Sequence, residues 1–120
     1  MNVIRFLPAL MMFFCLTCLG DPQENALPGN PATGKALIKQ VGCGSCHYIP
    51  GINTARGQVG PPLINMTHRA YLAGILPNNF QNMVLWIQHP QRIAPKSVMP
   101  DLGLDTAEAE AIAAYLYSLK

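Results

Sequence analysis

The sequence predicts an all-α fold, a small single domain in which three main helices alternate with long loops. Three segments combine apolar residues at helical spacing with residues that cap helix ends, whereas no segment alternates as a half-buried strand does. The length of 120 residues is enough for one domain. Half of the residues are hydrophobic, 12% are charged and the formal net charge is +2. This composition excludes a disordered chain and argues against a nucleic-acid partner.

The first helix is expected to begin after Asn30, which can cap it, with Pro31 at the favoured first helical position. Gly42 and Gly44 weaken the helix just before a turn that carries two cysteines. The apolar stripe of this helix is formed by Leu37, Ile38 and Val41.

The second helix is expected within the segment PNNFQNMVLWIQHP. Asn78 or Asn79 can cap it, and Pro90 is expected to end it. Its apolar residues repeat at helical spacing at Phe80, Val84 and Ile87.

The third helix has the clearest N-terminal signal, because Asp105 and Glu108 form an Asp-x-x-Glu variant of the capping box. Between the three helices lie YIPGINTARGQVGPPLIN and PQRIAPKSVMPDLGL, which are rich in proline and glycine and are expected to be loops. Loops this long are unusual in a compact small domain, and they are consistent with a large non-protein group at its centre. The apolar face of the third helix consists of Ala109, Ile112, Ala113, Leu116 and Leu119.

Residues 1–20 are expected to be an export signal. Arg5 precedes an apolar run of roughly 14 residues that ends at Leu19, which is shorter than the ~20 residues of a membrane-spanning helix and within the ~7–15 of an export signal. Two alternatives stay open, namely lipidation at Cys18, which would tether the chain to a membrane, and an N-terminal anchor that is retained. Residues 21–30 are expected to be a flexible tether, and the folded domain is expected to span residues 31–120.

The segment VGCGSCHYIPG places Cys43 and Cys46 within one turn, with His47 directly after them. A haem attachment site, half of a zinc site and a dithiol redox pair all use such residues. A structural zinc site needs four ligands, and the other two histidines, His68 and His89, lie far apart in the sequence. A dithiol pair is expected within a βαβ pattern, for which there is no strand signal.

Cys-x-x-Cys-His is the attachment pattern of a c-type haem. Two thiols within one turn can bond the two vinyl groups on one side of a porphyrin, and the next residue can reach the iron. The sequence therefore predicts one covalent haem c, with thioether bonds at Cys43 and Cys46 and His47 as an axial ligand. A porphyrin would also supply apolar surface that a domain of about 90 residues needs.

Met99 is the preferred candidate for the second axial ligand. It lies in APKSVMPDLG between Pro95 and Pro100, far enough along the chain to approach the opposite face of the ring. Because prolines stiffen that loop, little entropy is lost in ordering a weak thioether ligand.

The other methionines and histidines fit different roles. Met83 lies within the second predicted helix and is expected to fill the core. Met66 follows the proline pair closely and is expected on the same side of the ring as His47. His68 and His89 are expected at the surface or at helix ends.

If His47 and Met99 both bind the iron, no coordination position is open to oxygen or peroxide. His/Met ligation raises the reduction potential relative to bis-histidine ligation and suits electron transfer. The predicted function is to carry one electron, without enzymatic activity of its own. The alternative is a haem-ligand enzyme or sensor in which Met99 detaches and admits peroxide, CO or nitric oxide.

These motifs resemble those of the class I cytochromes c, over nearly all of the chain after the export signal. The resemblance includes CGSCH at 43–47, GPPL at 60–63, VMP around Met99 and the terminal IAAYLYSL. It implies the small cytochrome c fold around a covalently bound haem. It also implies that the carbonyl of Pro61 accepts a hydrogen bond from His47, which would fix the ring and its tautomer and increase its basicity.

The resemblance implies two further sets of contacts. The first and last helices are expected to cross where a small residue, Gly34 or Ala36, meets Tyr115. Tyr71 and Trp86 resemble aromatics that pack on the haem or bond its propionates, although a plain role in the core fits them equally well.

More narrowly, residues 71–104 are similar to bacterial cytochromes c and fused cytochrome c domains that serve haem–copper terminal oxidases. This implies a respiratory chain, with electrons passing from a quinol-oxidising complex to a terminal oxidase. It also implies a periplasmic location or one on the outer face of the cytoplasmic membrane, as a monomer or as a complex subunit. Because cations are few, docking is expected to depend more on apolar contact at the haem edge than on long-range steering. The cations expected near the haem are Arg56, Arg69, Arg92 and Lys96.

Overall fold

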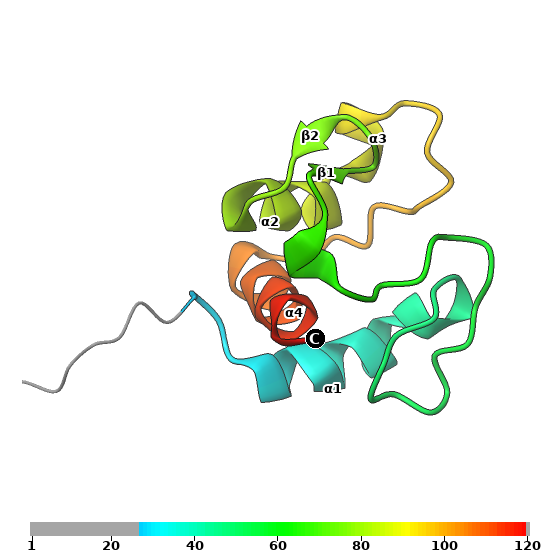
Figure 1. Cartoon of the computed structure of the whole chain (residues 1–120), viewed down its shortest axis with the longest axis vertical. Coiled ribbons are helices and arrows are strands. Elements are labelled where there is room, and N and C mark those ends of the chain that lie inside the picture. The colour runs from blue at the N-terminus through cyan, green and yellow to red at the C-terminus, as the bar shows by residue number, and fades with distance from the viewer. Residues whose placement is uncertain (1–26, 120) are drawn as a thin grey trace, which may run out of the picture.

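The computed structural model describes residues 27–119, and its helices confirm the all-α class (Figure 1). The predicted export signal at 1–20, the alternative lipidation site at Cys18 and most of the predicted tether lie outside the described residues. In chain order the elements are α1 (Pro31–Val41), the 3₁₀-helices η1 (Cys43–Ser45) and η2 (Met66–His68), β1 (Tyr71–Leu72), β2 (Leu76–Pro77), α2 (Phe80–Gln88), α3 (Pro90–Ile93) and α4 (Thr106–Ser118).

Both ends of α1 are capped by the residues that the sequence indicates. The side chain of Asn30 accepts hydrogen bonds from the backbone N–H groups of Ala32, at 2.8 Å, and Thr33, at 3.1 Å. At the other end Gly42 adopts a left-handed conformation with φ of 81°, and its N–H donates to the carbonyl of Ile38. The helix therefore ends immediately before the cysteine turn.

At the start of α2 the cap is Asn79, whose side chain accepts from the N–H of Asn82 at 2.8 Å. Asn78, the other candidate cap, instead joins three segments of the chain. Its Nδ2 donates to the carbonyl of Met66 at 2.6 Å and to that of Arg69 at 2.7 Å. Its Oδ1 accepts from the hydroxyl of Tyr117 in α4.

Three short elements, α3, β1 and β2, differ from the prediction. Pro90 follows the end of α2, but it also occupies the first position of α3, because its fixed φ suits a new helical turn. The prediction of no strands is wrong at β1 and β2, which pair antiparallel. Their turn has positive φ at Ala73 and Gly74, as a type I′ hairpin turn requires, and two-residue strands are too short to show alternation.

The fourth α-helix has the predicted capping box. The side chain of Asp105 accepts from the N–H of Glu108 at 2.8 Å, and the Glu108 carboxylate accepts from the N–H of Asp105 at 3.0 Å. The helix lies at the centre of the molecule, where it packs against α1 on one side and α2 on the other (Figure 1).

The crossing of α1 and α4 depends on a glycine. A Cβ placed on Gly34 would lie 1.9 Å from the carbonyl oxygen of Ala111, so only glycine lets the two backbones approach this closely. Ala36, the other candidate, is exposed. Tyr115, the predicted partner, lies one turn beyond Ala111 on α4, and its hydroxyl donates to the carbonyl of Pro50 at 2.8 Å.

Candidate cofactor site

A cavity of about 540 Å³ lies between the helices and loops of the described domain. We call it the central cavity. Its walls come from α1, the cysteine turn, the loop around residue 60, α2, the loop before α4, and α4 itself. The volume falls within the ~300–1,000 Å³ typical of organic cofactor and ligand sites. Apolar side chains that line it include Ile38, Leu63, Ile87 and Leu116.

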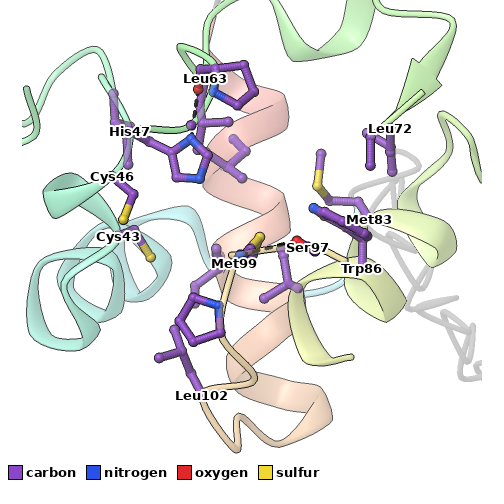
Figure 2. A pocket seen from close by; sticks show the side chains of 18 of the residues that line it. Cys43, Cys46, His47, Leu63, Leu72, Met83, Trp86, Ser97, Met99 and Leu102 are labelled. Atoms are coloured by element: carbon purple, nitrogen blue, oxygen red, sulfur yellow. Dashed lines mark hydrogen bonds between the residues drawn. The ribbon is translucent and has the colours of Figure 1, made fainter. Parts of the chain in front are cut away.

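The cysteine turn forms one wall of the central cavity. The N–H groups of Cys46, at 3.2 Å, and of His47, at 3.0 Å, both donate to the carbonyl of Cys43. This tight turn brings both free, half-buried thiols to the cavity beside the imidazole of His47 (Figure 2). Because two residues separate the cysteines, both sulfur atoms lie at the same wall of the central cavity.

The environment of Cys43 differs from that of a reactive dithiol. Burial, reinforced by the nearby Cys46, raises the pKa of the Cys43 thiol above its ordinary value, although a backbone hydrogen bond opposes the shift. A reactive redox cysteine instead has a lowered pKa, which keeps it as the thiolate. The raised pKa of Cys43 therefore argues against a dithiol redox pair at this turn.

Within residues 27–119, one ring nitrogen of His47 is hydrogen-bonded, and the other is not. Its Nδ1 lies 2.7 Å from the carbonyl oxygen of Pro61. A carbonyl can only accept, so Nδ1 carries the hydrogen, and in the neutral ring Nε2 keeps its lone pair for a metal. His47 lines the central cavity, so this donor serves the same space as the two thiols.

The missing side chain of Gly60 makes room for this ring. A Cβ at that position would lie 2.3 Å from Cε1 of His47. The N–H of Gly60 donates to the carbonyl of Cys46 at 2.8 Å, which ties the proline-rich loop to the cysteine turn. The loop thus positions the imidazole through a close backbone contact and, one residue later, through the carbonyl of Pro61.

Met99 lines the central cavity from the loop between α3 and α4. Figure 2 shows its sulfur atom and the imidazole of His47 in the same space, reached from different segments of the chain. Its backbone N–H donates to Oγ of Ser97 at 3.1 Å. Sequence reasoning assigned no role to Ser97; the only available signal was a serine two residues before the methionine, where its hydroxyl can form a local turn.

The other candidate ligands lie in different surroundings. Met66 and Met83 line the cavity but are buried in the apolar core. His68 is exposed on η2 and does not line the cavity. His89 follows α2, outside the cavity lining, and its Nδ1 lies 3.3 Å from Oδ2 of Asp101.

The rim of the cavity carries aromatic and cationic residues. Trp86 is half-buried in the wall, whereas Tyr71 is 60% exposed at the edge. Of the four cations expected near the cofactor, Arg69 and Lys96 line the cavity and Arg56 and Arg92 do not. The guanidinium of Arg69 donates to the carbonyls of Pro62 and Ile64, a brace on the proline-rich loop that sequence reasoning did not find.

Within residues 27–119, no three His, Cys, Asp or Glu side chains are grouped so that they could hold a metal ion. A structural zinc site needs such a group.

In the same part of the chain, no helix is both long enough and apolar enough to span a bilayer.

Fold and cavity together define a class, a small helical domain with an apolar cavity beside a Cys-x-x-Cys-His turn. Residues 31–120 match the family model described as cytochrome c, and the chain belongs to that family. Membership implies haem c as the cofactor and haem-based electron transfer as the activity. The apolar lining, the two thiols and the free Nε2 of His47 fit such a group.

Curated relatives include cytochrome c oxidase subunit 2 of Alkalihalophilus pseudofirmus, 36% identical over 88 residues, which cover 72% of this chain and 25% of the relative. The subunit 2 of Bacillus subtilis is 31% identical over 91 residues, which cover 72% of this chain and 26% of that protein. The chain therefore spans about a quarter of the length of these relatives.

Proposed function

We propose that this chain is a one-electron carrier whose haem c is bonded to Cys43 and Cys46 and ligated by His47 and Met99. The observation that carries the proposal is the convergence of both thiols, the imidazole and the thioether on one apolar cavity. When bound, the haem iron supplies a centre that alternates between two oxidation states. The protein's part is to hold this centre and to limit access to it.

The residues around the cavity contribute three effects. The carbonyl of Pro61 fixes the ring of His47 and increases the basicity of its free nitrogen. The apolar walls exclude water, which raises the reduction potential by disfavouring the more highly charged state. With Met99 as the second ligand, neither axial position would be open to a substrate.

The partners belong to the same proposal. The relatives named cytochrome c oxidase subunit 2 support a terminal oxidase as the electron acceptor. The donor would be a quinol-oxidising complex, and the chain would act outside the cytoplasmic membrane after export, as a free carrier or as a subunit. Folding of residues 31–120 as one domain, with a tether before it, would suit either arrangement.

The test compares one substitution at three methionines of the cavity. In Met99→Leu holoprotein we expect loss of the sulfur-to-iron charge-transfer absorption, a lower reduction potential and new binding of CO to the reduced form. Met66→Leu and Met83→Leu are matched controls and should keep the wild-type spectrum. An unchanged spectrum and potential in Met99→Leu would contradict the ligation. CO or peroxide binding by the wild-type protein would favour the alternative of an enzyme or sensor.

A further inference from the structure

The loop that carries Met99 has little structure of its own. It runs from Ala94 to Asp105, between α3 and α4, and contains neither helix nor strand. We call it the Met99 loop. Val98 is 81% exposed, Pro100 is exposed and Met99 is only half-buried. Val98 and Pro100 therefore add little packing on either side of Met99, whereas Leu104 at the end of the loop is buried in the core. Polar contacts also contribute to where the loop lies.

Two of those contacts come from consecutive residues at the end of α2. Nε2 of Gln88 donates to the carbonyl of Leu104 at 3.1 Å. Nδ1 of His89 lies 3.3 Å from Oδ2 of Asp101. These bonds hold the part of the loop that follows Met99. The neutral ring with its hydrogen on Nδ1 and the imidazolium can both donate to a carboxylate, so the contact does not depend on one protonation state.

A third contact holds the part of the loop that precedes the methionine. Nε2 of Gln91, in α3, donates to the carbonyl of Ser97 at 3.5 Å. The hydroxyl of Ser97 in turn accepts from the N–H of Met99 at 3.1 Å. Within residues 27–119, no other hydrogen bond reaches residues 95–104 of the loop from outside it.

All three donors lie where α2 ends and α3 begins. We call this part of the fold the α2–α3 corner; it consists of Gln88, His89 and Gln91. The corner is itself fixed. The N–H of His89 donates to the carbonyl of Leu85 at 2.9 Å, and its carbonyl accepts from the N–H of Arg92 at 3.1 Å. Pro90, the first residue of α3, is fully buried. The corner therefore provides a rigid support on both sides of Met99.

We propose that Gln88, His89 and Gln91 are positioning residues, which keep the Met99 thioether on the iron by holding its loop from both sides. The proposal rests on the ligation by Met99 proposed above. A thioether is a weak ligand, and the residues on either side of Met99 pack little, so each hydrogen bond to the loop shifts the balance between bound and detached sulfur. An added ligand binds the iron only in the detached state, and its apparent affinity is proportional to the population of that state.

The first measurement is the affinity of added imidazole for the ferric, full-length holoprotein. Gln88→Met and His89→Phe each remove one hydrogen bond and keep most of the side-chain volume. Each should raise imidazole affinity about two- to tenfold, the factor that corresponds to one ordinary hydrogen bond. His89→Asn places an amide donor where Nδ1 was and should restore affinity to near the wild-type value. Gln81→Met, on the exposed side of α2, is the matched control and should change nothing.

A second readout follows the loop itself. Hydrogen exchange of the Met99 and Gly103 amides should accelerate in Gln88→Met and His89→Phe by a factor similar to the gain in imidazole affinity, because both report the same opening. Gln91 is exposed, so Gln91→Ala tests the idea with little effect on folding. It should give the smallest change, since its bond is the longest.

The outcomes separate this inference from the proposed ligation. One outcome contradicts only this inference: the wild-type protein shows the sulfur-to-iron absorption, but the corner variants keep wild-type imidazole affinity and amide exchange and lose only stability. The corner is then ordinary packing, and the inference is wrong. If the wild-type protein lacks that absorption, and Met99→Leu alters nothing, the ligation by Met99 fails and the inference fails with it.

Discussion

The imidazole of His47 is controlled by two residues that have no reactive group. The carbonyl of Pro61 determines which ring nitrogen carries the hydrogen, and the absent side chain of Gly60 gives the ring its place. Both effects come from the backbone of one loop. The ligand role proposed for His47 thus depends on where that loop lies as well as on the imidazole itself.

Gly60→Ala should displace this imidazole, because the added Cβ would lie 2.3 Å from Cε1. We expect the free energy of unfolding to fall by about 1–3 kcal/mol, as in other overpacked sites, together with a changed absorption spectrum of the holoprotein. Gly74→Ala is a control for a generic glycine effect. Its φ is 69° and nothing lies within 4 Å of the new Cβ, so it should lose about 1 kcal/mol from backbone strain and keep the wild-type spectrum. A normal spectrum in Gly60→Ala would contradict the role given to this contact.

The two tyrosines of α4 predict how stability changes at alkaline pH. Burial raises the pKa of Tyr115 and of Tyr117 above the ordinary value, so folding favours the protonated phenols. Their contribution is complete below the unfolded pKa of about 10 and is lost as pH rises through the folded pKa. In the Tyr115→Phe/Tyr117→Phe double variant neither side chain ionises. Its free energy of unfolding should therefore fall less steeply than that of the wild type above about pH 10.

Denaturant unfolding across that alkaline range measures the difference in slope. Tyr115→Phe alone should also lose about 0.5–1.5 kcal/mol at neutral pH, because its hydrogen bond to the carbonyl of Pro50 is removed. Equal slopes for wild type and double variant would show that these phenols do not govern the alkaline loss of stability.

At the scale of elements, the helices with strong local signals are the ones that the sequence predicts. Asn30 and the Asp105–Glu108 pair cap helices through neighbours in the chain, so no tertiary information is needed to locate them. By contrast, the β1–β2 hairpin lacks the usual Asn-Gly or Asp-Gly turn signal, and Pro90, which begins α3, also marks the end of α2 in the sequence. Asn78 shows what local patterns cannot predict, because the three residues that it bonds through its side chain lie far from it in the sequence.

The packing of α1 on α4 gives a prediction at this scale. Gly34→Ala introduces a Cβ that would meet the carbonyl of Ala111 at 1.9 Å, so the two helices must separate. We expect a loss of about 1–3 kcal/mol or more in the free energy of unfolding, measured by chemical denaturation. Ala36→Ser, at an exposed position of the same helix, should change it by no more than about 0.5 kcal/mol. Similar small effects in both variants would mean that α1 and α4 do not pack this closely.

At the scale of the whole molecule, the central cavity explains why so much of a small domain is irregular. The loops on either side of η2 and the Met99 loop contribute to its walls, alongside the helices. A group that fills the space enclosed by these segments would help to order them. A covalently held cofactor would do so, and it would supply apolar contacts that a chain of this size cannot provide alone.

How much of this site the sequence predicts depends on how its parts are encoded. The cysteine turn is a contiguous motif, and Met99 is marked by its flanking prolines, so both can be proposed as site residues from the sequence alone. The residues that hold the Met99 loop cannot be found in this way, because Gln88 and His89 bond to residues that lie 16 and 12 positions away in the sequence. Such polar contacts leave no periodic pattern in the sequence. They follow from how α2, α3 and the loop meet in space.

The most direct test of the central claim is the intact mass of the denatured full-length chain, purified from a host that matures c-type cytochromes. We predict that one haem stays attached after denaturation and that Cys43 and Cys46 do not react with an alkylating reagent. The double variant Cys43→Ser/Cys46→Ser should lose the haem. A wild-type chain with no added haem mass, in which both thiols are alkylated, would contradict the account.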